Sequence, residues 1–302
     1  MDDMFGSVFE ELNKNFYKKH PYGQQTILGS VEHLKNPSLQ KMYEFFNTYY
    51  VANNMVLVLS GDFDIETITP LIKAKFGKWR TGKIPKFPII VEDEFDEREL
   101  IERRLTPVKA GTISFRTPKN NHPDQLTFEL ALQIITNYEE TGFLDQINDE
   151  GKVMTSGAFS LPNNDMSAMV IYFIPKLIGQ KLEDAEEIIL AQLEKLKNGD
   201  FSEEYLNAIK LNKQKEIASL WEDNEDRGLE MTQAFMQGTT WEKYYAKYKS
   251  IDGITKKNIV DVAKKYLGQN YLCLYSRMGF PKKEKLSKPA FEPVIPKNEI
   301  TS

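Results

Sequence analysis

A helix–turn–strand pattern occurs twice in this 302-residue sequence, and it constrains the fold more than any other feature. Residues 37–63 align without gaps on residues 254–280, a shift of 217 residues. Few aligned residues are identical, but the order of elements and the spacing of apolar residues agree. We therefore interpret the pattern as two copies of one α+β unit. The paired positions are Met42 and Ile259, Phe45 and Val262, Tyr49 and Tyr266, Asn53 and Asn270, Leu57 and Leu274, and Phe63 and Phe280.

The first copy predicts helix, helix, strand and helix. Residues 4–18 place apolar side chains at helical spacing, and the following sequence HPYG ends that helix with a turn. Residues 37–50 carry one apolar helical face after a proline–serine start. The continuous apolar run at 55–61 predicts a buried strand, and the next helix ends at Gly77.

The second copy is longer and contains more strands. Helical and alternating apolar patterns predict a mixed order of helices and strands, with a PNND turn between two adjacent strands. We expect an α+β fold made of two homologous units, with antiparallel-rich sheets packed against helices. The predicted elements are a strand at 110–118, helices at 124–138 and near 143–150, two strands within 153–175, helices at 177–198 and over most of 201–238, and a helix and strand within 254–280.

The domain organisation follows from these two copies. Residues 80–100 contain two prolines and an acidic cluster, which predicts a solvated connector and a boundary near residue 95. We predict a first unit at 1–95, a second unit at 96–280 and an extended Pro/Lys-rich linker at 281–302. The first unit is much the shorter, so we expect it to be truncated, with its missing part upstream of Met1.

Composition excludes several classes of protein. The formal charge is -5, and the lysines are interspersed with acids, which argues against a nucleic-acid partner. The single cysteine, Cys273, allows no intrachain disulfide and is expected to be a small buried side chain on a strand. No apolar run is long enough to span a membrane, and the N-terminus is not a signal peptide. We expect a soluble protein of a bacterial cytoplasm or periplasm.

Residues 20–79 resemble the segment that follows the zinc motif in the pitrilysin/insulinase family of zinc metallopeptidases. Residues 110–280 are similar to the second homologous domain of that family, notably GFLDQINDEGKV and MVIYFIPK. The resemblance also accounts for the repeat, because the family consists of paired α+β units. The shared features of the first segment are HPYG, Gly29, Tyr49-Tyr50, Asn54-Met55, Gly61-Asp62 and Phe76-Gly77-Trp79.

The resemblance implies a zinc site formed by an H-x-x-E-H helix and a later glutamate, with the motif glutamate as general base. This sequence contains no H-x-x-E-H. Its three histidines, His20, His33 and His122, include no pair four residues apart. We therefore assign no catalytic or metal residue, leave the substrate-binding residues undefined, and expect zinc only in a longer parent protein, with the motif upstream of Met1.

Other local patterns in the sequence offer further candidate sites. Glu32 and His33 match part of an inverted zinc motif, but Gly29 stands where that motif needs a histidine. His20 and His122 each precede a proline and are expected to shape turns. The acidic segment 221–228 lacks the oxygen pattern of a calcium loop, GKWRTGK lacks the order of a phosphate loop, and Tyr244, Tyr245 and Tyr248 are expected to pack in the core.

Two main functions remain open from the sequence. The first is a fragment of a zinc-dependent metalloendopeptidase that hydrolyses peptides or small proteins in an enclosed chamber, where this chain is scaffold and chamber wall. The second is a non-catalytic partner subunit or structural core protein of the same family. An unrelated binding module is a third reading. The expected partners are peptide substrates of the parent, its remaining domains or a partner subunit, and a second copy bound through exposed sheet edges.

Overall fold

The computed structural model describes residues 4–29, 31–35 and 37–280, and a five-stranded sheet lies at its centre. The strand order is β1-β5-β2-β4-β3, with β1 parallel to β5 and the other neighbours antiparallel. This sheet, covered by helices, confirms the predicted α+β class. The predicted linker 281–302 lies outside the described residues. The strands are β1 (Glu99–Thr106), β2 (Ala110–Thr117), β3 (Thr155–Leu161), β4 (Ser167–Ile174) and β5 (Leu272–Met278).

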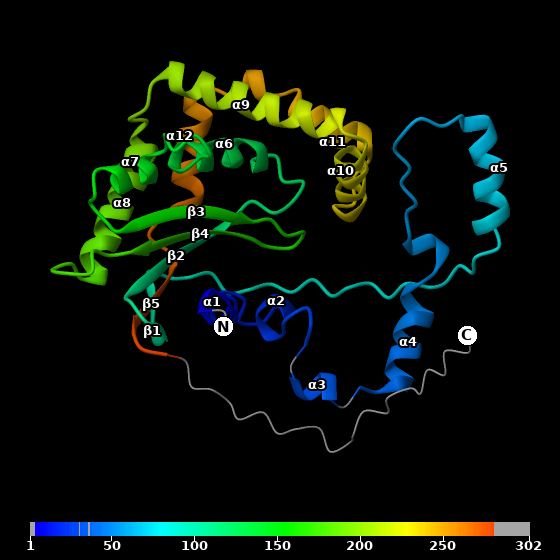
Figure 1. Cartoon of the computed structure of the whole chain (residues 1–302), viewed down its shortest axis with the longest axis horizontal. Coiled ribbons are helices and arrows are strands. Elements are labelled where there is room, and N and C mark those ends of the chain that lie inside the picture. The colour runs from blue at the N-terminus through cyan, green and yellow to red at the C-terminus, as the bar shows by residue number, and fades with distance from the viewer. Residues whose placement is uncertain (1–3, 30, 36, 281–302) are drawn as a thin grey trace, which may run out of the picture.

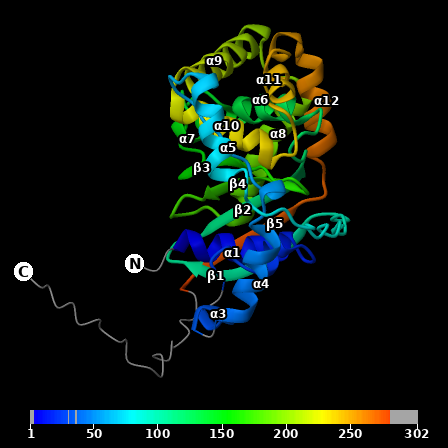
Figure 2. The same ribbon diagram turned by 90° about the vertical axis from the view of Figure 1, so that its right-hand side faces the viewer.

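A layer of helices covers one face of the sheet (Figure 1, Figure 2). Alternate residues of the strands point into this layer, among them Ile113 of β2, Ile171 of β4 and Tyr275 of β5, and all three are fully buried. These side chains and the apolar helix faces form the main core. The helices of this layer are α6 (Gln125–Ile135), α7 (Phe143–Asp149), α8 (Leu182–Asn198), α9 (Glu203–Glu222) and α12 (Lys256–Tyr266).

Helix α8 illustrates how the sequence sets these elements. Its buried residues include Leu182, Ile189, Leu193 and Leu196, which recur at helical spacing. Acidic residues occupy its first turn and lysines its last, as the helix dipole favours. Gly199 ends it in the left-handed conformation at φ 74°, which glycine adopts without steric cost.

One helix lies on the opposite face of the sheet. Helix α1 (Met4–Phe16) crosses that face and is followed by α2 (Pro21–Gln24) (Figure 1, Figure 2). Phe16 and Tyr17 pack against Phe95, Ala168 and Leu272 in a second, smaller cluster. The N-terminal part of the chain is thereby joined to the sheet formed by the second unit.

The rest of the chain forms two groups of helices. Helix α4 (Leu39–Tyr49) and helix α5 (Ile65–Phe76) stand apart from the sheet (Figure 1). Helices α10 (Asn224–Met236) and α11 (Trp241–Tyr248) continue the long helix α9. The short elements are α3 (Val31–Lys35), η1 (Ala52–Asn54) and η2 (Ile251–Gly253).

The two repeat copies share the same helix. Helix α12 begins and ends 217 residues after helix α4 begins and ends. The residues before them, Ser38 and Thr255, cap the two helices in the same way, because each side chain accepts a hydrogen bond from the backbone N–H three residues later. The helical part of the predicted repeat is confirmed.

The strand predicted at 55–61 is wrong. Its counterpart at the same shift is β5, which lies between β1 and β2 and is hydrogen-bonded to both. No described strand pairs with 55–61, and Met55, Val56 and Leu57 are 40%, 44% and 52% exposed. The apolar run has strand character but no neighbours that could complete its backbone hydrogen bonds.

Several other predictions need correction. The strand β1 was not predicted, because its charged residues hide the alternation of an edge strand. The acidic connector is not fully solvated: Glu92 and Phe95 are 4% and 2% exposed. The segment that contains His33, for which the sequence predicts no helix, forms the short helix α3. Helix α8 also begins five residues later than predicted, at Leu182.

Candidate functional site

His20 and His122 each have a structural role in a turn. His20 is 2% exposed and caps α2, because its Nδ1 accepts a hydrogen bond from the Tyr22 N–H at 3.3 Å. His122 shapes the turn before α6 in the same way, with Nδ1 3.1 Å from the Asp124 backbone nitrogen. The predicted turn roles of both are confirmed.

His33 lies exposed on the short helix α3. The side chain of Glu32, its suspected partner, lies outside the described residues, and Gly29 adopts φ 77° before the helix. Within the described residues, no group of three His, Cys, Asp or Glu side chains could hold a metal ion. This part of the chain does not fit a zinc site.

Residues 17–22, which include most of the HPYG turn, are hydrogen-bonded to the loop between β3 and β4. The Tyr17 hydroxyl donates to the Met166 carbonyl at 3.1 Å and accepts from the Asn163 amide at 3.2 Å. The Tyr22 hydroxyl donates to Asp165 at 3.3 Å, and His20 Nε2 lies 3.4 Å from the same carboxylate oxygen. Burial raises the pKa of Tyr17 to about 12, so its hydroxyl keeps its proton. We call residues 17–22 and 163–166 the hairpin clasp.

Glu92 of the connector is hydrogen-bonded to the hairpin clasp, and Arg116 of β2 contacts the connector. Glu92 Oε1 accepts from the backbone N–H groups of Lys19 and His20 at 2.7 and 2.6 Å. The Arg116 guanidinium lies 4.4 Å from the ring centre of Phe95 and donates to the Asp93 carbonyl at 2.8 Å. Burial lowers the pKa of Arg116. These contacts explain why part of the acidic connector is buried.

An ion pair between the partly exposed Arg98 and the buried Glu186 lies between the sheet and α8. Arg98 donates two hydrogen bonds to the Glu186 carboxylate, from Nε at 2.7 Å and Nη2 at 2.6 Å. Tyr271 donates to Glu186 Oε1 at 2.9 Å, Tyr275 donates to Oε2, and Cys273 Sγ lies 3.5 Å from Oε2. Cys273 and Tyr275 are alternate residues of β5, and Tyr271 immediately precedes that strand, so the three side chains lie on one face of the sheet. We call this set the Glu186 cluster.

The electrostatics of the Glu186 cluster follow from its contacts. Burial alone would raise the pKa of Glu186, but the hydrogen bonds from Arg98, Tyr275 and Tyr271 outweigh it and hold that pKa below its usual value. Burial and the nearby carboxylate raise the pKa of Cys273, which therefore stays a thiol. Sequence reasoning missed this cluster. The signal was Glu186 itself, a charged residue on the apolar face of α8.

The remaining sequence candidates are structural. Tyr244 is 6% exposed and its hydroxyl donates to Glu230, which agrees with the expected packing role. In the segment 221–228, Asp223 caps α10 through the N–H groups of Glu225 and Asp226. In the sequence GKWRTGK, Arg80 binds two backbone carbonyls of α4. These contacts account for each candidate without a ligand.

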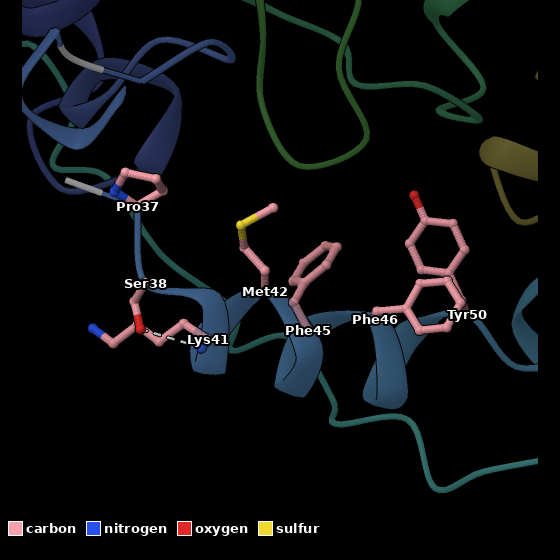
Figure 3. Close-up of a pocket in the computed structure, with 7 residues that line it drawn as sticks. All are labelled: Pro37, Ser38, Lys41, Met42, Phe45, Phe46 and Tyr50. Atoms are coloured by element: carbon pink, nitrogen blue, oxygen red, sulfur yellow. Dashed lines mark hydrogen bonds between the residues drawn. The ribbon is translucent and has the colours of Figure 1, made fainter. Parts of the chain in front are cut away.

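The described surface includes two apolar hollows. One lies along α4, where Met42, Phe45, Phe46 and Tyr50 form an open patch with a volume of about 470 Å³ (Figure 3). The other, which we call the α1 groove, has a volume of about 500 Å³ and lies between α1 and strands β2, β4 and β3. The α1 groove is the better enclosed of the two.

Comparison with known families decides the relationship. The family described as the peptidase M16 inactive domain matches residues 37–213, which is more than half of the chain. The chain belongs to this family. The membership confirms the resemblance to the zinc metallopeptidases that the sequence indicated.

Relatives of this M16 chain agree with the assignment. It is 23% identical over 229 residues to the zinc protease PqqE of Helicobacter pylori, covering 73% of this chain and 50% of that protein. The peptidase M16 inactive domain from Pseudomonas fluorescens has the same fold, with a TM-score of 0.75, 15% identity, and coverage of 91% of this chain and 65% of the other. The chain thus spans about half the length of the curated relative.

The same fold occurs within longer chains. The periplasmic protease PqqL from Escherichia coli matches with a TM-score of 0.70 and 15% identity, covering 91% of this chain and 32% of that one. In that protein the matching fold occupies about a third of the chain. In the part of the present chain that the structure describes, no helix is long and apolar enough to cross a membrane.

Proposed function

We propose that this chain is a non-catalytic part of a zinc-dependent metalloendopeptidase that hydrolyses peptides or small proteins in an enclosed chamber. The chain supplies scaffold and part of the chamber wall, and a segment outside it supplies the zinc ligands and the general base. The match of residues 37–213 to the inactive-domain family carries this proposal. Zinc proteases among the relatives support the class of reaction.

The residues described above support a non-catalytic role for this chain. His20 and His122 each use a ring nitrogen to accept a hydrogen bond from a backbone N–H. The open sheet face beside α1 offers apolar surface of the kind that lines a peptide-holding wall. The boundaries 1–95, 96–280 and 281–302 belong to the same proposal, with 96–280 as the inactive unit.

The experiment compares the purified chain with the natural protein including any residues encoded upstream. We expect no stoichiometric zinc and no turnover of a fluorogenic peptide by the chain alone, and both from a longer protein that carries H-x-x-E-H. Zinc binding with turnover by the chain itself would refute the non-catalytic role. Degenerate motif positions and no turnover would instead support the alternative, a partner subunit or structural core protein.

The proposal includes partners and compartment. The remaining domains of the same polypeptide or a family partner subunit complete the chamber, and the chain alone dimerises through exposed sheet edges. Light scattering at high concentration tests the dimer, and a strict monomer would contradict it. We place the protein in a bacterial cytoplasm or periplasm, which cell fractionation tests.

A further inference from the structure

The apolar face of α4 has a covered counterpart in the same chain. Helix α12, its equivalent in the second copy of the repeat, packs against α6, α8 and β2. The side chains that α12 buries are Ile259, Val262 and Ala263. The residues at the same positions of α4 are each at least half exposed, namely Met42, Phe45 and Phe46. Met42 and Phe45 project from the same side of α4 (Figure 3), and within the described residues this side lacks the cover that α12 has.

Residues 55–59 show the same contrast with their equivalents in β5. Residues Leu272–Ser276 of β5 are fully buried, because this strand is paired on both edges and the sheet is covered on both faces. Cys273 lies in the main core on one face, and Leu272 lies in the smaller cluster on the other. In the first copy, Leu57 is 52% exposed, and no described strand pairs with the segment. The segment thus has strand character without the cover and the neighbours that β5 has.

The two edges of residues 55–59 decide which kind of partner fits. A strand that becomes buried must pair the backbone N–H and C=O groups on both of its edges. A small apolar ligand or a lipid would cover the side chains and leave those backbone groups unpaired, whereas an added polypeptide strand supplies both donors and acceptors. By analogy with β5, the partner adds one parallel strand, as β1 does, and one antiparallel strand, as β2 does. It also places helices on the apolar face of α4.

The surface that would receive this partner is already held in shape. Arg80 donates to two backbone carbonyls of α4, at 2.6 and 3.1 Å. Asn53 and Gly82 exchange two hydrogen bonds, at 2.8 and 2.9 Å. These contacts fix α4 and the start of residues 55–59 against the segment that follows α5. A partner that docks there therefore pays little for ordering the surface.

The repeat also indicates where the partner lies in the polypeptide. The strands that pair with β5 and the helices that cover α12 all precede them, within residues 99–198. Helix α1 precedes α4 but packs on the sheet of the second unit, so it does not fill this role. We propose that α4 and residues 55–59 are the docking site for a segment encoded upstream of Met1, which inserts one strand on each side of 55–59. The inference rests on the proposed function only for that upstream segment, and not for its zinc chemistry.

The test compares the 302-residue chain with the protein extended upstream as its gene encodes it, and follows the labelling of an introduced thiol by a maleimide. Leu57→Cys places the thiol on residues 55–59, and the native Cys273 is fully buried. We expect labelling of Leu57→Cys to be at least about 100-fold slower in the extended protein, because the thiol there is reached only when the structure opens. Ile178→Cys, at a site 91% exposed in the second unit, should react equally fast in both proteins.

A proline variant tests the strand pairing itself. Val56→Pro removes a backbone N–H from the segment, and it should bring labelling of Leu57→Cys in the extended protein to within about tenfold of the rate in the 302-residue chain. Met55, with φ -127° and ψ 151°, already has the extended conformation that a following proline requires, so the shorter chain stays folded. Ile89→Pro is the matched control at a connector site that is 94% exposed, and it should leave the thiol protected. Circular dichroism verifies the fold of each variant.

The outcomes separate this inference from the proposed function. Equal labelling of Leu57→Cys in both proteins, or a reading frame that begins at Met1, would overturn the inference. Protection in the 302-residue chain alone that is lost on dilution would assign the site to a second copy and would also overturn it. The labelling needs neither zinc nor turnover. A protected thiol in an inactive extended protein therefore contradicts only the proposed function, and a freely labelled thiol in an active peptidase contradicts only this inference.

Discussion

Arg98 joins the connector to helix α8 by donating two hydrogen bonds, at 2.7 and 2.6 Å, to the Glu186 carboxylate. Glu186 is 4% exposed, so Arg98→Ala would leave a buried charge with only the two tyrosine hydroxyls and the thiol as donors. We expect a loss of about 3 kcal/mol in the free energy of unfolding, the lower end for a broken buried pair because the Arg98 side chain is 34% exposed. Urea denaturation measures it.

The control for Arg98 is the more exposed pair of Arg103 and Glu11. Arg103 is 44% exposed and lies 2.6 Å from the Glu11 carboxylate. Arg103→Ala should cost no more than about 1 kcal/mol. Equal losses of unfolding free energy for Arg98→Ala and Arg103→Ala would show that the Glu186 cluster stabilises the fold no more than the exposed pair does.

The Glu186 cluster also predicts a pH dependence. The pKa of Glu186 is lower in the folded chain than its ordinary value of 4.5. The unfolded state therefore takes up a proton first, and the stability from this group is fully present above about pH 4.5 and is lost as the pH falls through the folded pKa. Glu186→Gln should flatten the fall in unfolding free energy between about pH 5 and 3. An unchanged slope would contradict the prediction.

The hairpin clasp gives a third prediction. Tyr17→Phe removes the hydroxyl that donates to Met166 and accepts from Asn163, while the ring stays packed. We expect a loss of about 1–2 kcal/mol in unfolding free energy. Tyr138→Phe is the matched control, because Tyr138 is 98% exposed and should lose nothing measurable. Thermal unfolding of both variants decides whether the clasp stabilises the chain.

Much of the fold could be predicted because local patterns and packing agree in the second unit. Helix α12 and strand β5 form where the apolar spacing places them, with partners on both sides. The same reasoning failed at 55–61. An apolar run shows that a segment could be buried as a strand, but it does not show whether neighbouring strands are present to pair with it. The strand β1 was missed because its charged residues hide the alternation of an edge strand, and its parallel partner β5 is more than 160 residues away along the chain.

The candidate site was less predictable than the fold. The turn roles of His20 and His122 follow from their neighbouring prolines, and the structure agrees. The Glu186 cluster joins residues from the connector, α8 and β5, which no local pattern connects. The α1 groove depends on α1 crossing the sheet of the other predicted unit, a contact between segments that the sequence assigned to different domains.

The last prediction concerns two leucines that occupy equivalent positions in the repeat but have different surroundings. Leu274 of β5 is fully buried, whereas Leu57 at the equivalent position is 52% exposed. Leu274→Ala should lower the unfolding free energy by about 2–5 kcal/mol through lost burial and a cavity. Leu57→Ala should change it by less than about 0.5 kcal/mol, as surface substitutions do. Both are measured by urea denaturation of the 302-residue chain. A large loss from Leu57→Ala would mean that 55–61 is packed in solution as β5 is, and that the first copy completes its strand without further polypeptide.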